Sequence, residues 1–198
     1  YGGGEFREKR DLEQVHLTMA FPSVAFDHPD FYAVQVLSTV LGGGMSSRLF
    51  QEVREKRGLA YSVFSFAQSY LDTRIFGIYA GTGETQVAEL AQVVADQVRQ
   101  VAQDITDEET ARARAQHKAG VLMGLESSAA RCEQMARQLL VFGRSIPPAE
   151  LIAKVDAVDA PTLRRIAAET VAAGPMSLAA LGPLGGLESY DLLAARFD

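Results

Sequence analysis

The chain contains no tryptophan, one cysteine and three histidines among its 198 residues. Because Cys132 has no second cysteine to pair with, no disulfide forms within the chain and no cysteine-rich metal site is present. His16, His28 and His117 include no pair at the spacing that places two imidazoles on one metal ion, and catalytic zinc needs about three protein ligands. The sequence therefore predicts that this chain alone holds no metal ion and no other cofactor.

Positive charge and long apolar runs are also scarce. There are 19 lysines and arginines against 25 aspartates and glutamates, a formal net charge of -6, which argues against a nucleic-acid-binding protein. No run reaches the roughly 18 consecutive apolar residues of a membrane-spanning helix, so no membrane span is expected. Apolar residues nevertheless make up 47% of the chain, enough for a globular core without disulfide or metal cross-links.

The first residues, Tyr1-Gly2-Gly3-Gly4, show neither an initiator methionine nor a signal peptide. We therefore expect a segment of a longer protein. Nothing calls for an oxidising compartment, and the expected location is the cytoplasm. Residues 1–11 are polar and glycine-rich and are predicted to be a leading arm or linker. Residues 12–182 are predicted to form one domain, and residues 183–198 a tail.

Hydrophobic periodicity predicts the elements of that domain. Val15, Leu17, Met19 and Phe21 alternate with more polar residues, as in a half-buried strand. The other predicted elements are a helix from 31 to 41, a short helix over 46–57, a hairpin of strands 59–70 and 74–81, helices beginning at 85, 106, 127, 148 and 160, and a strand over 176–181. Gly58 can end the short helix in the left-handed conformation, and the residues from Thr106 to Glu109 are predicted to form a capping box. This order predicts an α+β fold with helices packed on one face of a mixed or antiparallel sheet.

Two further motifs have ordinary structural explanations. The segment from Gly81 to Thr85 resembles a phosphate-binding loop but lacks the Gly-Lys-Ser/Thr ending, so a strand-to-helix turn is predicted. A small-molecule-binding domain stays open as a hypothesis, and it requires a deep apolar pocket near Gly81-Thr82-Gly83. Cys132 lies in a helical run without a nearby group to lower its pKa, which predicts a buried, inert thiol.

The segment from Leu41 to Val63 carries the candidate functional residues. Arg54 lies near the end of the predicted short helix, and Tyr61 lies at the start of the next strand, with one chain reversal between them. Both side chains can therefore point into one cleft, where a guanidinium and a phenol would donate hydrogen bonds to a carbonyl oxygen. From the pattern alone, the commoner outcome is a solvated helix-end cation and a strand-edge aromatic.

Long ordered strings in this sequence closely resemble the C-terminal half of peptidase family M16, the group of pitrilysin, insulin-degrading enzyme and mitochondrial processing peptidase. The resemblance covers nearly the whole chain and is closest to the processing-peptidase branch. The strings that carry it are the strand from Val15 to Phe21, the stretch VLSTVLGGGMSSRLF from Val36 to Phe50, and Val155-Asp156-Ala157-Val158 with Leu163 and Ile166.

The resemblance implies one half of a two-part zinc metalloendopeptidase that cleaves peptides or presequences. In this family an inverted His-x-x-Glu-His motif, with a further glutamate downstream, holds zinc in a homologous N-terminal domain, and that motif does not occur in this sequence. This chain would then be the partner half, inactive alone, acting with the N-terminal zinc-binding domain of the same protein. Arg54 and Tyr61 match the spacing of the arginine and tyrosine that the family's C-terminal half contributes to the cleft. The resemblance implies that they bind the peptide backbone and stabilise the developing oxyanion.

The loop Gly42-Gly43-Gly44 lies where the non-catalytic processing-peptidase subunit has a much longer glycine-rich segment. The short loop implies a chain of the catalytic-subunit type or a bacterial relative, in a homodimer or heterodimer. An alternative of another class stays open, namely a non-catalytic scaffold like the core subunits of a respiratory complex, which share this fold.

Overall fold

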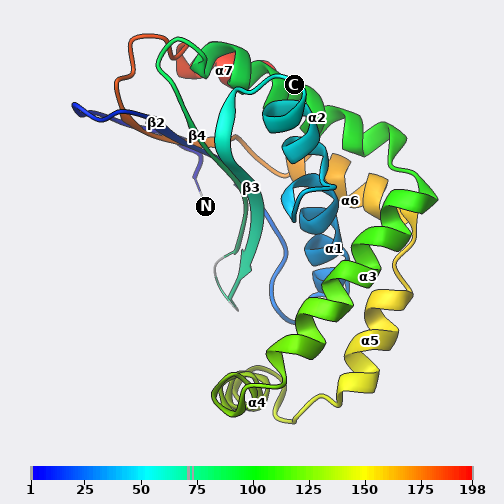
Figure 1. Ribbon diagram of the computed structural model, residues 1–198. Coiled ribbons are helices and arrows are strands. Elements are labelled where there is room, and N and C mark those ends of the chain that lie inside the picture. Colours follow the sequence, from blue (N-terminus) through cyan, green and yellow to red (C-terminus); the bar gives the residue numbers. More distant parts are fainter. Residues whose placement is uncertain (1, 71, 73, 198) are drawn as a thin grey trace.

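The computed structural model describes residues 2–70, 72 and 74–197, and it shows one mixed sheet covered by helices on one face (Figure 1). The order of strands across the sheet is β1-β5-β2-β4-β3; β1 is parallel to β5, and the other neighbouring pairs are antiparallel. The five strands are β1 (Gly4–Lys9), β2 (Val15–Pro22), β3 (Ala60–Ser69), β4 (Arg74–Thr82) and β5 (Ser177–Gly182). The α+β prediction is therefore confirmed.

The helices lie together to one side of the sheet, and in the described part of the chain none packs against the opposite face (Figure 1). They are α1 (Phe31–Gly42), the π-helix η1 (Phe50–Glu55), α2 (Val87–Asp104), α3 (Asp107–Gly124), α4 (Ser128–Phe142), α5 (Pro148–Asp156), α6 (Ala160–Ala172) and α7 (Tyr190–Ala194). The predicted hairpin is formed by β3 and β4, although Leu71 and Thr73 of its predicted turn lie outside the described residues.

The core lies between the sheet and the helices. Val15, Leu17, Met19 and Phe21 are almost fully buried on the helix side of β2, as their alternation predicts. They belong to one hydrophobic cluster with residues of α1, α2 and α6, among them Val34, Leu37, Leu90, Val94, Leu163 and Ile166. Burying each side chain of this size contributes roughly 1.5–3 kcal/mol, so this side of the sheet fixes the register of the strands.

The predicted leading arm is corrected by the structure, because Gly4–Lys9 form strand β1 at one edge of the sheet. Gly4 pairs with Ser177 and Lys9 with Gly182 along β5. The strand went unrecognised because four of its six residues are charged and it has no apolar alternation. Charged side chains are common on edge strands, where they oppose pairing with other chains.

The predicted tail is likewise part of the packed structure. It contains α7, in which Leu193 is 1% exposed, and the ring of Phe197 packs edge-on against Phe21 with 4.9 Å between ring centroids. The Tyr190 hydroxyl donates to the Met176 carbonyl at 2.5 Å, next to the start of β5. The C-terminal residues up to Phe197 therefore close one end of the core.

Helix α4 differs from the other long helices because little of it is buried. The thiol of Cys132 is exposed, which corrects the prediction of a buried thiol, and only Gln138 of this helix is buried. α4 lies beyond the end of the hairpin, across a cavity of about 1040 Å³. That cavity is lined by residues of α1, β3, α3, α4 and α5, but not by Gly81, Thr82 or Gly83. It therefore gives no support to a small-molecule site at the β4–α2 turn.

Candidate functional site

The segment that carries Arg54 is held in place by two buried side chains. Leu49 and Val53 are fully buried in the core, and Phe50 and Arg54 lie on the outer side of the same turn. The Lys56 amide donates to the Gln51 carbonyl at 2.9 Å, five residues earlier, so η1 is a π-helix where an ordinary helix was predicted. Short π-helical turns occur frequently at functional sites, where the widened turn redirects a side chain.

A glycine reverses the chain between η1 and β3. Gly58 has a φ of +62°, the left-handed conformation in which glycine is favoured, as the sequence predicts for this position. Its amide donates to the Arg54 carbonyl at 3.0 Å, and the Leu59 amide donates to the Val53 carbonyl at 2.9 Å. The reversal is therefore fixed by two backbone hydrogen bonds, and it brings the start of β3 back beside Arg54.

Tyr61 lies on an irregularity of β3. Ala60 pairs with Thr82 and Ser62 with Gly81, which leaves Tyr61 as an extra residue without an opposite partner on β4. A β-bulge of this kind bends the strand and turns the bulged side chain away from the regular alternation. The Tyr61 side chain is 77% exposed, so its hydroxyl faces solvent.

The structure brings Arg54 and Tyr61 together, as their spacing predicts. The Arg54 guanidinium carbon lies 4.7 Å from the centroid of the Tyr61 ring and 4.7 Å from that of Phe50. Aromatic faces attract a guanidinium without occupying its N–H donors. Within the described residues no acceptor binds the Arg54 side chain, whereas Lys56 and Arg57 both pair with Glu52. The two rings thus orient the Arg54 guanidinium, and its N–H donors stay free to bind a ligand.

A second arginine of this segment has a structural role. Arg48 donates to both carboxylate oxygens of Glu109, at 2.7 and 2.8 Å, and to Asp104 at 2.5 Å. Glu109 also completes the predicted capping box of α3 with Thr106. Burial acts to raise the pKa of Glu109, but the hydrogen bonds from Arg48 and Thr106 outweigh it and lower that pKa to about 2. These contacts hold the segment just before η1 against the end of α2 and the start of α3.

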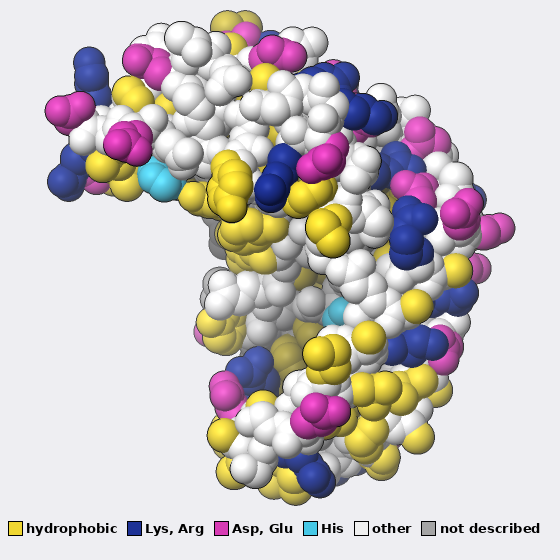
Figure 2. Space-filling view, viewed as in Figure 1, with side chains coloured by type: hydrophobic (Ala, Val, Ile, Leu, Met, Phe, Trp, Pro, Cys, Tyr) yellow, Lys and Arg dark blue, Asp and Glu magenta, His cyan; other side chains and the backbone are white. Residues whose placement is uncertain are grey.

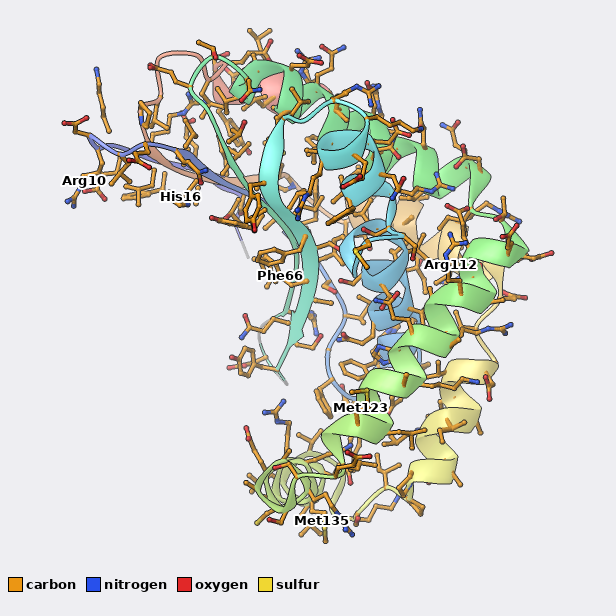
Figure 3. All side chains as sticks on the ribbon, in the orientation of Figure 1. Arg10, His16, Phe66, Arg112, Met123 and Met135 are labelled. Carbon is orange, nitrogen blue, oxygen red and sulfur yellow. The ribbon has the colours of Figure 1, made fainter. Side chains whose placement is uncertain are left out.

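The uncovered face of the sheet carries aromatic side chains that the sequence analysis did not single out. The ring centroids of Phe64 and Tyr79 lie 5.0 Å apart, and those of Phe64 and Phe66 lie 6.3 Å apart. The Tyr79 hydroxyl is also 2.7 Å from Nδ1 of His16. Figure 3 shows Phe66 and His16 on the side away from the helices. The period of two along β3 and β4 was the signal that could have found them.

The molecule is hollowed on this side (Figure 2). Hydrophobic side chains line part of the hollow, and α4 forms its lower boundary in this view. Among the described residues, no group of three or more histidine, cysteine, aspartate or glutamate side chains is placed to hold a metal ion. None of the described helices combines the length and apolar character needed to cross a membrane.

Comparison with known families and proteins finds similarity to a peptidase family. A family model described as "Peptidase M16 inactive domain" matches residues 1–117. An uncharacterized zinc protease of Streptomyces coelicolor is 38% identical over 176 residues, which cover 88% of this chain and 38% of that protein. The mouse mitochondrial-processing peptidase subunit beta is 34% identical over 206 residues, covering 99% of this chain and 42% of that subunit.

A third relative, an uncharacterized zinc protease of Bacillus subtilis, is 34% identical over 182 residues, covering 91% of this chain and 44% of that protein. Among solved structures, a chain of Complex III2 from Candida albicans superposes with a TM-score of 0.91 at 22% identity, covering 98% of this chain and 49% of that one. At this identity the likeness shows the fold alone. The chain spans less than half the length of each of these proteins.

Proposed function

Because the chain belongs to the peptidase M16 family, we propose that it is the C-terminal, non-zinc-binding half of a zinc metalloendopeptidase that cleaves peptides or presequences. The zinc ion that the relatives' names imply would be held by an N-terminal domain of the same protein. The acidic and histidine side chains of this chain form no suitable cluster in its described part, so they are not assigned to the metal. This half would contribute Arg54 and Tyr61 to the cleft.

The pairing of Arg54 with Tyr61 is the observation that carries the proposal. A π-helix, a left-handed glycine and a β-bulge together direct a guanidinium and a phenol to one place on the surface. Both groups are hydrogen-bond donors, and their N–H and O–H groups are not used by the described part of the chain. Donors fixed in this way stabilise negative charge as it develops on a carbonyl oxygen. They would also hold the backbone of the bound peptide.

The partners and location follow from the same proposal. The N-terminal domain and a peptide substrate are the proposed partners, within a homodimer or heterodimer. Two of the three relatives described above are bacterial, and the short loop Gly42-Gly43-Gly44 is consistent with a bacterial chain. A cytoplasmic location is proposed from the sequence alone, and residues 12–182, with the packed strand β1 and α7, are proposed to be one domain.

A non-catalytic scaffold is the second candidate, and the fold shared with a chain of Complex III2 favours it. The two candidates differ in the residues that precede this half. An intact His-x-x-Glu-His motif in the N-terminal domain supports the peptidase, and a motif lacking its histidines or glutamate supports the scaffold. Sequencing the region upstream of Tyr1 in the source gene discriminates between them.

The activity test compares the complete enzyme with the 198-residue chain. We expect the complete enzyme to contain stoichiometric zinc and to cleave an unfolded peptide in a chelator-sensitive manner. We expect the 198-residue chain, purified without an affinity tag, to melt cooperatively, to carry no stoichiometric zinc and to leave the peptide uncut. Chelator-sensitive turnover by the 198-residue chain, or a complete enzyme without zinc or activity, would contradict the proposal.

A further inference from the structure

The cavity of about 1040 Å³ lies apart from the candidate functional site. Its wall includes residues 67–70, where β3 ends, whereas Tyr61 lies at the beginning of that strand. At about 3.3 Å per residue, this separates the two places by roughly 20 Å. Small-molecule sites in proteins have volumes of about 300–1000 Å³. The cavity is therefore large enough for one drug-sized molecule.

The wall of the cavity formed by α3, α5, α1 and the loop before α1 is mainly apolar. The ring centroid of Phe26 lies 4.6 Å from that of Phe31 and 5.5 Å from that of Phe142, so aromatic rings meet where α1 faces the end of α4. Removing apolar side chains from water is a main source of affinity in such sites. The apolar side chains of this wall include those of Phe26, Phe31, Val121, Leu151, Ile152 and Val155.

Helix α4 forms the opposite wall without filling the cavity. Met135, Leu139 and Leu140 are exposed and do not line the cavity, and Figure 3 shows Met135 on the side of α4 away from the hairpin. The Gln138 side-chain oxygen accepts from the Ile146 amide at 2.8 Å, and because both residues are buried this contact fixes the end of the helix. The space is thus kept open. The face that α4 turns toward it includes Ala130, Glu133, Gln134, Arg137, Gln138 and Val141.

The cations around the cavity are already paired with carboxylates. Lys118 pairs with Asp156 at 2.5 Å, and Arg137 pairs with Glu133 at 3.2 Å. An anionic ligand would therefore find no free positive charge among the described residues of the wall, and burying an unpaired charge is costly. Asp72, the other charged residue of the wall, is exposed to water, where a single carboxylate attracts a cation only weakly. These charges favour an uncharged ligand.

Two uncharged polar groups of the wall are available to a ligand. The Tyr32 hydroxyl and the His117 imidazole belong to half-buried residues that line the cavity, and neither group forms a hydrogen bond within the described part of the chain. Burial lowers the pKa of His117, so at pH 7 its ring is neutral and has one N–H donor and one acceptor nitrogen. Burial raises the pKa of Tyr32, which keeps its proton. Each group can bind a polar group of an otherwise apolar molecule.

We propose that the cavity between α4 and the rest of the domain binds one uncharged, mainly apolar small molecule, which donates a hydrogen bond from an N–H or O–H group to His117. The apolar wall supplies most of the affinity, and the neutral imidazole supplies the preference for a ligand with a donor. Because the cavity is separate from Arg54 and Tyr61, the inference goes beyond the proposed function and does not depend on it.

The test uses the complete protein that carries this chain and the probe N-phenyl-1-naphthylamine, which is uncharged, has one N–H group and fluoresces strongly only in apolar surroundings. In a fluorescence titration, Ala130→Trp should weaken binding about tenfold or more, because the indole takes the place of the probe against the apolar wall. Ala136→Trp is the matched control. Ala136 is exposed on the same helix but does not line the cavity, so this variant should bind the probe normally.

The hydrogen bond to His117 is tested with a second probe, the N-methyl derivative of the first, which has no N–H group. His117→Leu should weaken binding of the N–H probe about threefold to tenfold, the range for one hydrogen bond. The same variant should bind the N-methyl probe as well as the wild type does. If Ala130→Trp fails to fold, this comparison still decides, because both probes are tested on the same pair of proteins.

Three results would overturn the proposal: equal binding by Ala130→Trp and Ala136→Trp, equal effects of His117→Leu on the two probes, or binding by the 198-residue chain that is absent from the complete protein. The last result would mean that the rest of the protein covers the cavity. The proposed function is judged separately by turnover. Arg54→Lys and Tyr61→Phe should bind the probe as the wild type does, whether or not they cleave peptides.

Discussion

Arg48 and Arg54 belong to the same short segment, yet their surroundings are opposite. Arg48 is 13% exposed in its side chain and binds two carboxylates, one of them through two parallel hydrogen bonds. Arg54 lies against two aromatic rings, and within the described residues no carboxylate or carbonyl accepts from it. Of these two arginines, six residues apart, Arg48 therefore holds the structure together and Arg54 faces outward.

The difference shows how the fold separates stability from binding. A guanidinium saturated by Glu109 and Asp104 contributes to folding and has few donors left for a ligand. A guanidinium stacked on rings is kept in direction by contacts that use none of its N–H groups. Variants at the two positions should therefore affect different measurements.

The largest expected effect is a loss of turnover when Arg54 or Tyr61 is substituted. In the complete enzyme, Tyr61→Phe removes only a hydroxyl, and Arg54→Lys replaces a planar fork by a point charge. Loss of one donor aimed at developing charge costs about 10²–10³ in turnover, roughly 3–4 kcal/mol. The unfolding temperature should hardly change, because the Tyr61 side chain is 77% exposed. The measurement is turnover per folded molecule, with thermal unfolding of each variant.

Near-normal turnover in both variants would show that Arg54 and Tyr61 have no catalytic role. Arg54 would then be a solvated cation at a helix end, and Tyr61 an aromatic residue at a strand edge. A large fall in unfolding temperature with little change in turnover would remove the contrast with Arg48.

The next largest effect is expected on the free energy of unfolding when Arg48 is substituted. Arg48→Ala leaves the Glu109 carboxylate, whose side chain is 19% exposed, without its two guanidinium hydrogen bonds. We expect a loss of about 2 kcal/mol in the free energy of unfolding, in the range for hydrogen bonds to charged groups. Arg99→Ala is the matched control: it removes an exposed arginine from its ion pair with Asp96 and should cost no more than about 0.5 kcal/mol. Equal losses in the two variants would contradict the structural role of Arg48.

Low pH should weaken the ion pair between Arg48 and Glu109. The pKa of Glu109 is about 2 in the folded chain against 4.5 for the ordinary carboxyl. Its stabilising contribution is therefore complete above pH 4.5 and is lost as the pH falls toward 2. Chemical unfolding from pH 7 to pH 2 should show the free-energy difference between wild type and Glu109→Gln shrinking over that range. A difference that stays constant with pH would mean that the pair does not lower this pKa.

The smallest effect is expected at Arg57, which lies on the turn next to the candidate site. Its guanidinium pairs with Glu52 at 2.6 Å on the surface, where such pairs contribute little. Arg57→Lys should change the free energy of unfolding by less than about 0.5 kcal/mol and leave turnover unchanged. A collapse of turnover here, with normal rates for Arg54→Lys, would show that the functional arginine has been misplaced.

The sequence predicted those features that are local or periodic. The alternation along β2, the capping box from Thr106 to Glu109 and the left-handed Gly58 each depend on a few neighbouring residues, and all three are confirmed. The proximity of Arg54 and Tyr61 was also predictable, because one reversal separates them. Their chemical role stays a prediction.

Features that depend on distant residues were missed. β1 is a strand only because β5 lies beside it, and its own charged sequence has no strand pattern. The ion pair of Arg48 with Glu109 joins residues that no spacing rule connects. Cys132 lies near Met135 and Leu139 in the sequence of α4, but little of α4 is buried, so the expected burial of the thiol does not occur.

The pairing of β1 with β5 has a consequence for how the chain is made. Gly4 leaves the ribosome long before Ser177, the residue with which it pairs. Contacts between residues so far apart in sequence form late, because the whole intervening chain has to be ordered first. We expect β1 to stay unpaired on the nascent chain until β5 has emerged. The four charged residues of β1 oppose pairing with further strands at the edge of the finished sheet. During synthesis they would also oppose pairing of the still unpaired β1 with other chains.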